Sequence, residues 1–226
     1  MSSDLIVSYD GTPNDDDALA LGKLLVQSGA SLSLAYIRHS REFDPRREEL
    51  AQHDAERRLE HGAAWLGDAA IPRHVVFSGS TGVGLEQLAE AEQASVIVFG
   101  SDYRTPPGRA EPGTSAQRLL EGGSVAIAVA AAGLRTRADA GIAAIAVAAP
   151  DGDRAAQQSA EALAAKLGAR IVDLTPPGAA AIDLIVVGSQ PNSGSRRITL
   201  SGATRTTLNS ARGSVLVLPS GGAIGL

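Results

Sequence analysis

One arrangement of apolar and glycine-rich segments occurs twice in this chain, and it restricts the fold more than any other feature. In residues 95–129 an apolar run ends at Gly100-Ser101, a loop rich in proline and glycine follows, and Gly113-Thr114 opens a short amphipathic segment before the apolar run Val125 to Val129. The same order recurs in residues 183–218. Near-continuous apolar runs are typical of strands buried on both faces of a parallel sheet. The repeat therefore predicts two related α/β halves.

The first half contains a full set of alternating strands and helices. Thr12-Pro13-Asn14 and Gly29 provide start and stop signals for its first helix. Gly79 to Gly84 is expected to be a flexible loop, and Ser80 within it matches neither a nucleophile elbow nor a phosphate loop. The expected strands are Leu5 to Tyr9, Leu32 to Ile37, His74 to Phe77, Ser95 to Gly100 and Val125 to Val129, and the later helices are Arg46 to Leu66 and Leu85 to Gln93. The alternating charges of the helix at 46–66 indicate a solvated face with i,i+4 pairs, and Leu50, Leu59 and Trp65 are expected on its drier side.

The second half is shorter. The charged segment Leu134 to Ala140 lacks periodicity and is expected to separate a complete domain (1–134) from a truncated one (141–226). The second domain should contain a strand at 142–148, a helix at 154–167, a strand at 170–174, a turn at 175–178 and a strand from Asp183. So few residues precede Asp183 that a helix, a strand and another helix must be missing. The glycine-rich tail Ser220 to Leu226 is expected to be mobile.

Composition excludes several classes of function. The net charge of −5 and the aromatic content of 3% argue against a nucleic-acid-binding protein, which needs basic and stacking side chains. The absence of cysteine excludes disulfides and thiolate metal ligands. No apolar run approaches the ~18 residues of a membrane span, so we expect a cytoplasmic protein without membrane or nucleic-acid partners.

The segments VSYDGTP after the first strand and VIVFGS at the end of the fourth resemble the universal stress protein family. The resemblance implies an α/β fold with two flavodoxin-like open parallel sheets in the order 3-2-1-4-5, the second lacking its third strand and flanking helices. The family's nucleotide pattern is G-x2-G-x9-G-[ST], and this chain keeps its spacing as Gly100, Tyr103 and Gly113-Thr114, with tyrosine in place of the second glycine. The second copy is more eroded, with Gly188, Pro191 and Ser201-Gly202.

The resemblance also implies a ligand and a set of contacts. An adenine nucleotide, ATP or AMP with Mg²⁺ only alongside it, would bind in the first half, in a stress-response protein that is not an enzyme or hydrolyses ATP slowly at most. Asp10 would contact the adenosine and the backbone near Ile37 the adenine. The ribose and phosphates would be surrounded by Gly100, Ser101, Tyr103, Gly113, Thr114 and Ser115, with added charge from Arg104 and Arg109.

Two other functions remain open. One is a ligand-free, partner-binding scaffold, which is favoured if the Tyr103 ring fills the phosphate position. The other is a calcium-dependent nucleoside hydrolase, because DGTPNDDDALAL resembles that family's DxDPGxDDAxA. Against it, Asp15, Asp16 and Asp17 are expected to act only through the dipole of the helix they begin. The four histidines are scattered, and no metal-ligand spacing is apparent.

The resemblance finally predicts how the halves meet. Relatives dimerise through antiparallel fifth strands, and an unpaired sheet edge is a liability that such pairing removes. Val125 to Val129 and Val215 to Leu218 should therefore pair within one chain as an intramolecular pseudo-dimer, with a continuous sheet of five plus four strands. A further homo-oligomer is compatible with this arrangement.

Overall fold

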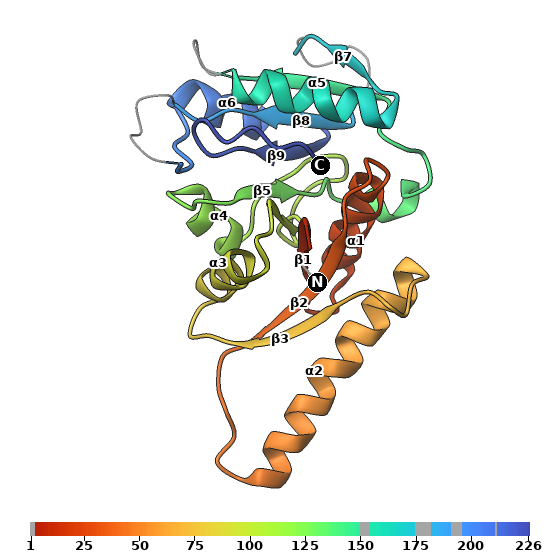
Figure 1. Ribbon diagram of the computed structural model, residues 1–226, viewed down its shortest axis with the longest axis vertical. Coiled ribbons are helices and arrows are strands. Elements are labelled where there is room, and N and C mark those ends of the chain that lie inside the picture. The colour runs from red at the N-terminus through yellow and green to blue at the C-terminus, as the bar shows by residue number, and fades with distance from the viewer. Residues whose placement is uncertain (1–2, 150–153, 175–181, 191–195, 211) are drawn as a thin grey trace.

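A computed structural model describes residues 3–149, 154–174, 182–190, 196–210 and 212–226. Its strands form one nine-stranded sheet in the order β3-β2-β1-β4-β5-β9-β8-β6-β7. Figure 1 shows the two halves stacked on either side of β5 and β9, which lie at the centre of the molecule. The expected turn at 175–178 and Pro191 lie outside the described residues.

The first half has the predicted strand order 3-2-1-4-5, and all its strand pairs are parallel. Its strands are β1 (Leu5–Ser8), β2 (Leu32–Arg38), β3 (Arg73–Phe77), β4 (Val96–Phe99) and β5 (Ala126–Val129). Its helices are α1 (Pro13–Val26), α2 (Pro45–Leu66), α3 (Thr81–Glu92) and α4 (Thr114–Leu120), followed by the 3₁₀ helix η1 (Leu134–Arg137). These strands are buried on both faces apart from β3 at the sheet edge, which explains their continuous apolar runs.

The second half is a smaller version of the same unit. It contains β6 (Ala144–Ala148), α5 (Ala155–Leu167), β7 (Arg170–Val172), β8 (Leu184–Val187), α6 (Gly202–Ser210) and β9 (Ser214–Val217). β6 pairs in parallel with β7 and β8, and β8 with β9. β7 lies at the edge of the sheet. It corresponds to β2, which in the first half is followed outward by the additional edge strand β3.

β5 and β9 join the halves by antiparallel pairing, with Ala128 opposite Leu216. The pairing predicted from the two fifth apolar runs is thus observed, and it makes the two parallel sheets one mixed sheet. Each face of this sheet carries one hydrophobic cluster that runs through both halves, one beneath α1, α2 and α5 and the other beneath α3, α4 and α6. The two halves therefore share their core.

The segments that follow β5 and β9 are packed against helices. After β5, the N–H groups of Gly133 and Arg135 donate to the carboxylate of Asp17 on α1. After β9, the N–H of Ile224 donates to Ser159 Oγ on α5, and Leu226 is buried. The prediction of a mobile tail is therefore wrong, because the tail buries apolar side chains and makes backbone hydrogen bonds.

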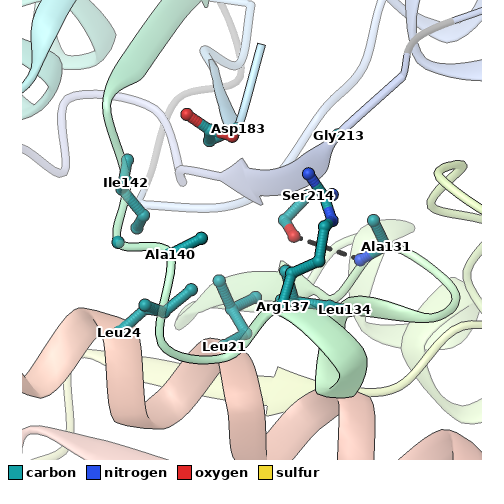
Figure 2. Close-up of a pocket in the computed structure, with 11 residues that line it drawn as sticks. Leu21, Leu24, Ala131, Leu134, Arg137, Ala140, Ile142, Asp183, Gly213 and Ser214 are labelled. Carbon is teal, nitrogen blue, oxygen red and sulfur yellow. Dashed lines mark hydrogen bonds between the residues drawn. The ribbon is translucent and has the colours of Figure 1, made fainter. Parts of the chain in front are cut away.

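Close packing also holds where the linker crosses from one half to the other. Figure 2 shows Leu21 and Leu24 of α1 facing Leu134 and Ile142 across a small cavity, with Ser214 Oγ accepting from the N–H of Ala131. The cavity has a volume of about 20 Å³, close to the room that one water molecule needs. The part of the seam where the linker crosses therefore offers no space for a larger ligand.

Two local expectations are wrong. The segment Gly79 to Gly84 is mostly helical, because α3 begins at Thr81 with Ser80 as its N-cap. A Cβ at Gly84 would lie 2.8 Å from the Ser78 side chain, so this glycine permits close packing instead of a flexible loop. Leu50, placed on the dry side of its helix, is 66% exposed, because α2 extends beyond the strands (Figure 1). Among the described residues, no helix is long and apolar enough to cross a membrane.

Candidate functional site

The carboxyl ends of β1 and β4 lie side by side at one edge of the sheet. β2 lies on the other side of β1. The chain builds the sheet outward from β1 through β2 and β3 and then returns to β4 on the opposite side of β1, so the strand order reverses between β1 and β4. In open α/β sheets this position is where ligands bind. The structure brings three of the predicted site residues to this edge: Asp10 directly after β1, Ile37 near the end of β2 and Gly100 directly after β4.

The turn after β1 is held by the carboxylate of Asp15. Its Oδ2 accepts from the N–H of Asp10 (3.1 Å), the N–H of Thr12 (2.9 Å) and the Thr12 hydroxyl (2.8 Å). This capping box fixes the start of α1. Within the described part of the chain, the carboxylate of Asp10 has no hydrogen-bonding partner, and the residue is exposed. Asp10 is thus a positioned carboxylate that is free to meet a ligand.

Two basic side chains border Asp10. Arg58 of α2 donates from Nη1 to the Asp10 carbonyl oxygen (2.8 Å), and its guanidinium lies 5.4 Å from the centre of the Tyr36 ring. On the other side, His39 Nδ1 lies 3.0 Å from the Ser78 carbonyl oxygen, which accepts only, so this nitrogen carries a proton. The Arg58 guanidinium therefore holds a positive charge beside the end of β1.

Burial is the largest cause that raises the pKa of Asp10 above its ordinary value, followed by the negative charge of Asp15. Arg58 and His39 act in the opposite direction. Although much of the residue is exposed, protein atoms on one side of its carboxyl group exclude water and partly desolvate it. Burial also raises the pKa of Asp15, against the hydrogen bonds from Thr12 and Asp10 that lower it.

Ile37 presents an open backbone position at the same edge. In a parallel sheet, alternate residues bond to opposite neighbours. Ala35 accepts from Tyr9 on the β1 side, whereas Arg38 accepts from Ser78 on the β3 side. The N–H and C=O of Ile37 therefore face β1, whose pairing with β2 ends at Ser8 opposite Ala35. Within the described residues neither group has a recorded partner, which leaves a donor and an acceptor facing the space next to Asp10.

Gly100 serves a contact within the protein. A Cβ at this position would collide with the backbone carbonyl of Asn14, so the end of β4 passes directly against the start of α1. The Asn14 side chain reinforces the contact by donating from Nδ2 to the Ser101 carbonyl oxygen (3.1 Å). The glycine of the predicted nucleotide pattern is thus required here by strand–helix packing.

Ser101 closes the loop that follows. Its buried hydroxyl donates to the Ala130 carbonyl oxygen (2.6 Å) and accepts from the N–H of Glu111 (3.1 Å). The N–H of Asp102 donates to the carbonyl oxygen of Glu111 (2.8 Å). The loop is thereby folded back on itself and fastened to the end of β5.

The remaining predicted residues lie farther along this loop. Tyr103 is 72% exposed, and its ring centre lies 4.9 Å from the Arg104 guanidinium, so the ring points outward and does not fill a cavity. Arg109 is half-buried, and its carbonyl oxygen accepts from the N–H of Ala132. Gly113 is the N-cap of α4, which begins with the exposed Thr114 and the half-buried Ser115.

The second half repeats the loop closure atom for atom. Ser189 Oγ donates to the Leu218 carbonyl oxygen (2.6 Å) and accepts from the N–H of Thr199 (3.1 Å), while the N–H of Gln190 donates to the Thr199 carbonyl oxygen (2.9 Å). Ser201 then caps α6 through the N–H of Thr204 (3.0 Å). The equal geometry shows that the two copies share one structural device.

Comparison with known proteins decides the family. The family model described as the universal stress protein family matches residues 1–131, more than half of the chain. The chain belongs to the universal stress protein family. None of the curated proteins matches it.

Solved structures share the fold over nearly the whole chain. A universal stress protein from Archaeoglobus fulgidus DSM 4304 is 16% identical, with a TM-score of 0.57 over 97% of this chain and 99% of its own. A protein of unknown function from Pseudomonas aeruginosa PAO1 is 14% identical (TM-score 0.64, 97% and 94%). A putative universal stress protein from Pseudomonas aeruginosa UCBPP-PA14 is 15% identical (TM-score 0.61, 96% and 93%). The tandem architecture therefore occurs in other proteins.

The acidic run of this universal stress protein has three separate tasks. Asp15 caps α1, Asp16 Oδ1 lies 3.4 Å from the Tyr9 hydroxyl, and the buried Asp17 binds the linker and Arg135 (2.8 Å). The expectation that the three act only through the helix dipole is wrong. Among the described residues no group of three acidic, histidine or cysteine side chains could hold a metal ion. The resemblance to calcium-dependent hydrolases thus finds no support in the geometry.

Sequence reasoning missed Arg58 and His61. Both lie on α2, which was interpreted as a solvated charged helix. Its repeated i,i+4 charges hide the fact that Arg58 reaches Asp10 and that His61 Nδ1 lies 2.8 Å from the buried hydroxyl of Tyr9. Ser189 had a usable signal, since it follows Gly188 as Ser101 follows Gly100.

Proposed function

We propose that this protein is a stress-response regulatory protein whose first half binds an adenine nucleotide. One observation carries the proposal: the carboxylate of Asp10 and the backbone N–H and C=O of Ile37 all lack partners within the described residues and face the same edge of the sheet. Unpaired backbone groups at a buried position are costly. A ligand that offers both a donor and an acceptor would remove this cost.

Adenine has the required chemistry. Its Watson–Crick edge carries an amino donor beside a ring-nitrogen acceptor, which complements the C=O and N–H of one residue. With the base at Ile37, the ribose hydroxyls would meet the carboxylate of Asp10, an acceptor that forms strong charge-assisted hydrogen bonds. The residues from Gly100 to Ser115 would lie next to the phosphates, with Mg²⁺ present only together with the nucleotide.

A thermal-shift and calorimetry series tests this proposal. AMP and ATP should raise the melting temperature of the full chain, and Asp10→Ala should remove the shift. Glu121→Gln is the matched control, because Glu121 is an exposed carboxylate at the far end of α4 and its loss should leave binding unchanged. If saturating nucleotide shifts the melting temperature of neither the parent chain nor the Glu121→Gln control, the proposal of nucleotide binding is wrong.

A second candidate function is a ligand-free scaffold that binds a protein partner. It is favoured by the closure of the Ser101 loop, whose polar groups bond to one another, and by the role of Gly100 in packing against Asn14. The same calorimetry separates the candidates, since the scaffold predicts no heat with any nucleotide. In both cases we propose a non-catalytic protein, and the two halves act as each other's partner through β5 and β9.

A further inference from the structure

We propose that the first half recognises the nucleoside and leaves the phosphates without specific contacts. This inference rests on the proposed function and specifies its ligand class: adenosine, AMP and ATP should bind with nearly equal affinity. Four features of the loop between β4 and α4 support it: its backbone hydrogen bonds, its attachment to the second half, its charge and the orientation of Tyr103.

A phosphate-binding loop needs several backbone N–H groups that converge on one point outside the loop. Here most N–H groups between residues 102 and 111 are donated within the protein, and Pro106 and Pro107 have none. Among the described contacts, only the N–H groups of Tyr103 and Ala110 remain without a recorded acceptor. The donating residues and their acceptors are Asp102 (Glu111 O), Arg104 (Asp102 Oδ1), Thr105 (Asp102 O), Gly108 (Ala132 O), Arg109 (Pro106 O) and Glu111 (Ser101 Oγ).

The loop is also tied to the rest of the molecule. Ser101 fastens its start to Ala130, and the Gly108 carbonyl oxygen accepts from the N–H of Gly213 in the second half (2.8 Å). Rearranging the loop around a phosphate would therefore disturb its contacts with the end of β5 and across the seam between the halves. The second copy closes its loop through the same bonds at Ser189, so this closed form is a built feature of the fold.

Charge gives no compensation. Residues 101–112 carry two carboxylates, Asp102 and Glu111, and two guanidinium groups, Arg104 and Arg109, so the loop has no net charge. Asp102 accepts from the N–H of Arg104, which places a carboxylate inside the loop. The Arg104 guanidinium is engaged with the exposed ring of Tyr103. Residues 101–112 would thus offer a triphosphate neither a cluster of free donors nor a positive field, and beyond them, up to the end of α4, only the N–H groups that open this seven-residue helix lack a recorded acceptor among the described residues.

The opposite end of the site is open. Asp10 and Ile37 offer partnerless polar groups, and Arg58 and His39 border them. The free donors and acceptors thus lie where the base and ribose would bind, next to a loop, residues 101–112, whose polar backbone groups are mostly paired within the protein. The geometry therefore favours a nucleoside ligand whose phosphates extend into solvent.

Calorimetry of the full chain with adenosine, AMP and Mg-ATP, each at low and high salt, tests the inference. The three dissociation constants should agree within about threefold and change little with salt, because bonds to a gripped triphosphate are charge-assisted and screened by ions. ATP binding more than about tenfold tighter than adenosine, a difference of about 1.4 kcal/mol, would overturn the inference and leave the proposed function intact. Binding of none of the three ligands would overturn both.

Tyr103→Gly, which restores the glycine of the family pattern, and Tyr103→Ala, which removes the ring alone, give a second test. Because the ring already points outward, both variants should bind ATP and adenosine within about twofold of the parent, well short of the tenfold step of 1.4 kcal/mol. A selective gain in ATP affinity for Tyr103→Gly would contradict the inference, since it would show that the closed loop can still hold phosphate. Glycine's backbone freedom would then be the missing element.

Discussion

Asp10 carries an electrostatic cost in the unliganded protein. Burial and the neighbouring Asp15 raise its pKa, and Arg58 and His39 offset only part of that effect. An acid with a raised pKa in the folded state contributes stability below its unfolded pKa, and that stability is lost as the pH rises through the folded value. A carboxylate kept at such a cost is typical of a binding site.

Asp10→Asn should therefore raise the melting temperature at neutral pH while it weakens nucleotide binding. The stabilisation should disappear below about pH 4, the ordinary pKa of aspartate, where both proteins carry a neutral group. Melting curves between acidic and neutral pH measure the effect. Equal melting temperatures for the two proteins at every pH would show that Asp10 bears no electrostatic cost.

Gly100→Ala tests the contact between β4 and α1. A Cβ there collides with the Asn14 backbone, which cannot rotate away as a side chain would, so we expect a loss of about 1–3 kcal/mol. In a chain of this length each kcal/mol lowers the melting temperature by about 2–4 °C. Gly113→Ala is the control, since its Cβ meets nothing within 4 Å. Similar melting temperatures for both variants would contradict the packing role of Gly100.

For single residues, the sequence predicted the positions of the site residues better than their roles. Asp10, Ile37 and Gly100 do lie at one edge, because the carboxyl ends of neighbouring parallel strands always meet there. The hydroxyl of Ser101 and the space beside Gly100, in contrast, are used inside the protein. A spacing motif cannot separate these uses, since close backbone approach requires glycine whether the neighbour is a phosphate or a helix.

Among the elements, the linker η1 is held to α1 by one buried carboxylate. Asp17 is 1% exposed and accepts from the N–H groups of Gly133 and Arg135 and from the Arg135 guanidinium, each at 2.8 Å. Asp17→Ala would leave the N–H groups of Gly133 and Arg135 without their acceptor, so it should cost about 1–3 kcal/mol, as leaving a buried donor unsatisfied does. Denaturant unfolding measures the loss, with Asp16→Ala as the neighbouring control. A cost below about 1 kcal/mol, the value of an exposed pair, would contradict this role.

The apolar strands were predictable as elements because both faces are buried, so hydrophobicity alone marks them. The start of α3 was not, since Gly82 and Gly84 suggest a loop. Both are buried, and Gly84 packs against Ser78 and Ile37. The tail was misjudged for a related reason, because Ser159, which accepts from Ile224, is distant in sequence. Local composition does not reveal contacts between residues that are distant in the sequence.

For the molecule as a whole, antiparallel pairing of β5 and β9 turns two incomplete sheets into one. The first half alone would expose the buried edge of β5, and the second half alone would expose the edge of β9. The second half also has only four strands and two described helices with which to bury its core. Both edges are short and aliphatic, and neither carries the charges or prolines that protect exposed edges. The halves therefore depend on each other unequally.

Separate expression of residues 1–134 and 141–226 tests this dependence. The first fragment should fold and form a dimer through its free β5 edge, which light scattering after size-exclusion chromatography would show. The second should be insoluble alone, because it lacks the helices and third strand that complete the first half, and co-expression with residues 1–134 should restore its solubility through β5–β9 pairing. Ala128→Lys in the first fragment is the control: it places a charge in the middle of β5, opposite Leu216, and should prevent both the dimer and the rescue. Recovery of 141–226 as a soluble monomer that unfolds cooperatively would contradict the shared core, because that fragment would then bury its own hydrophobic faces without the partner half.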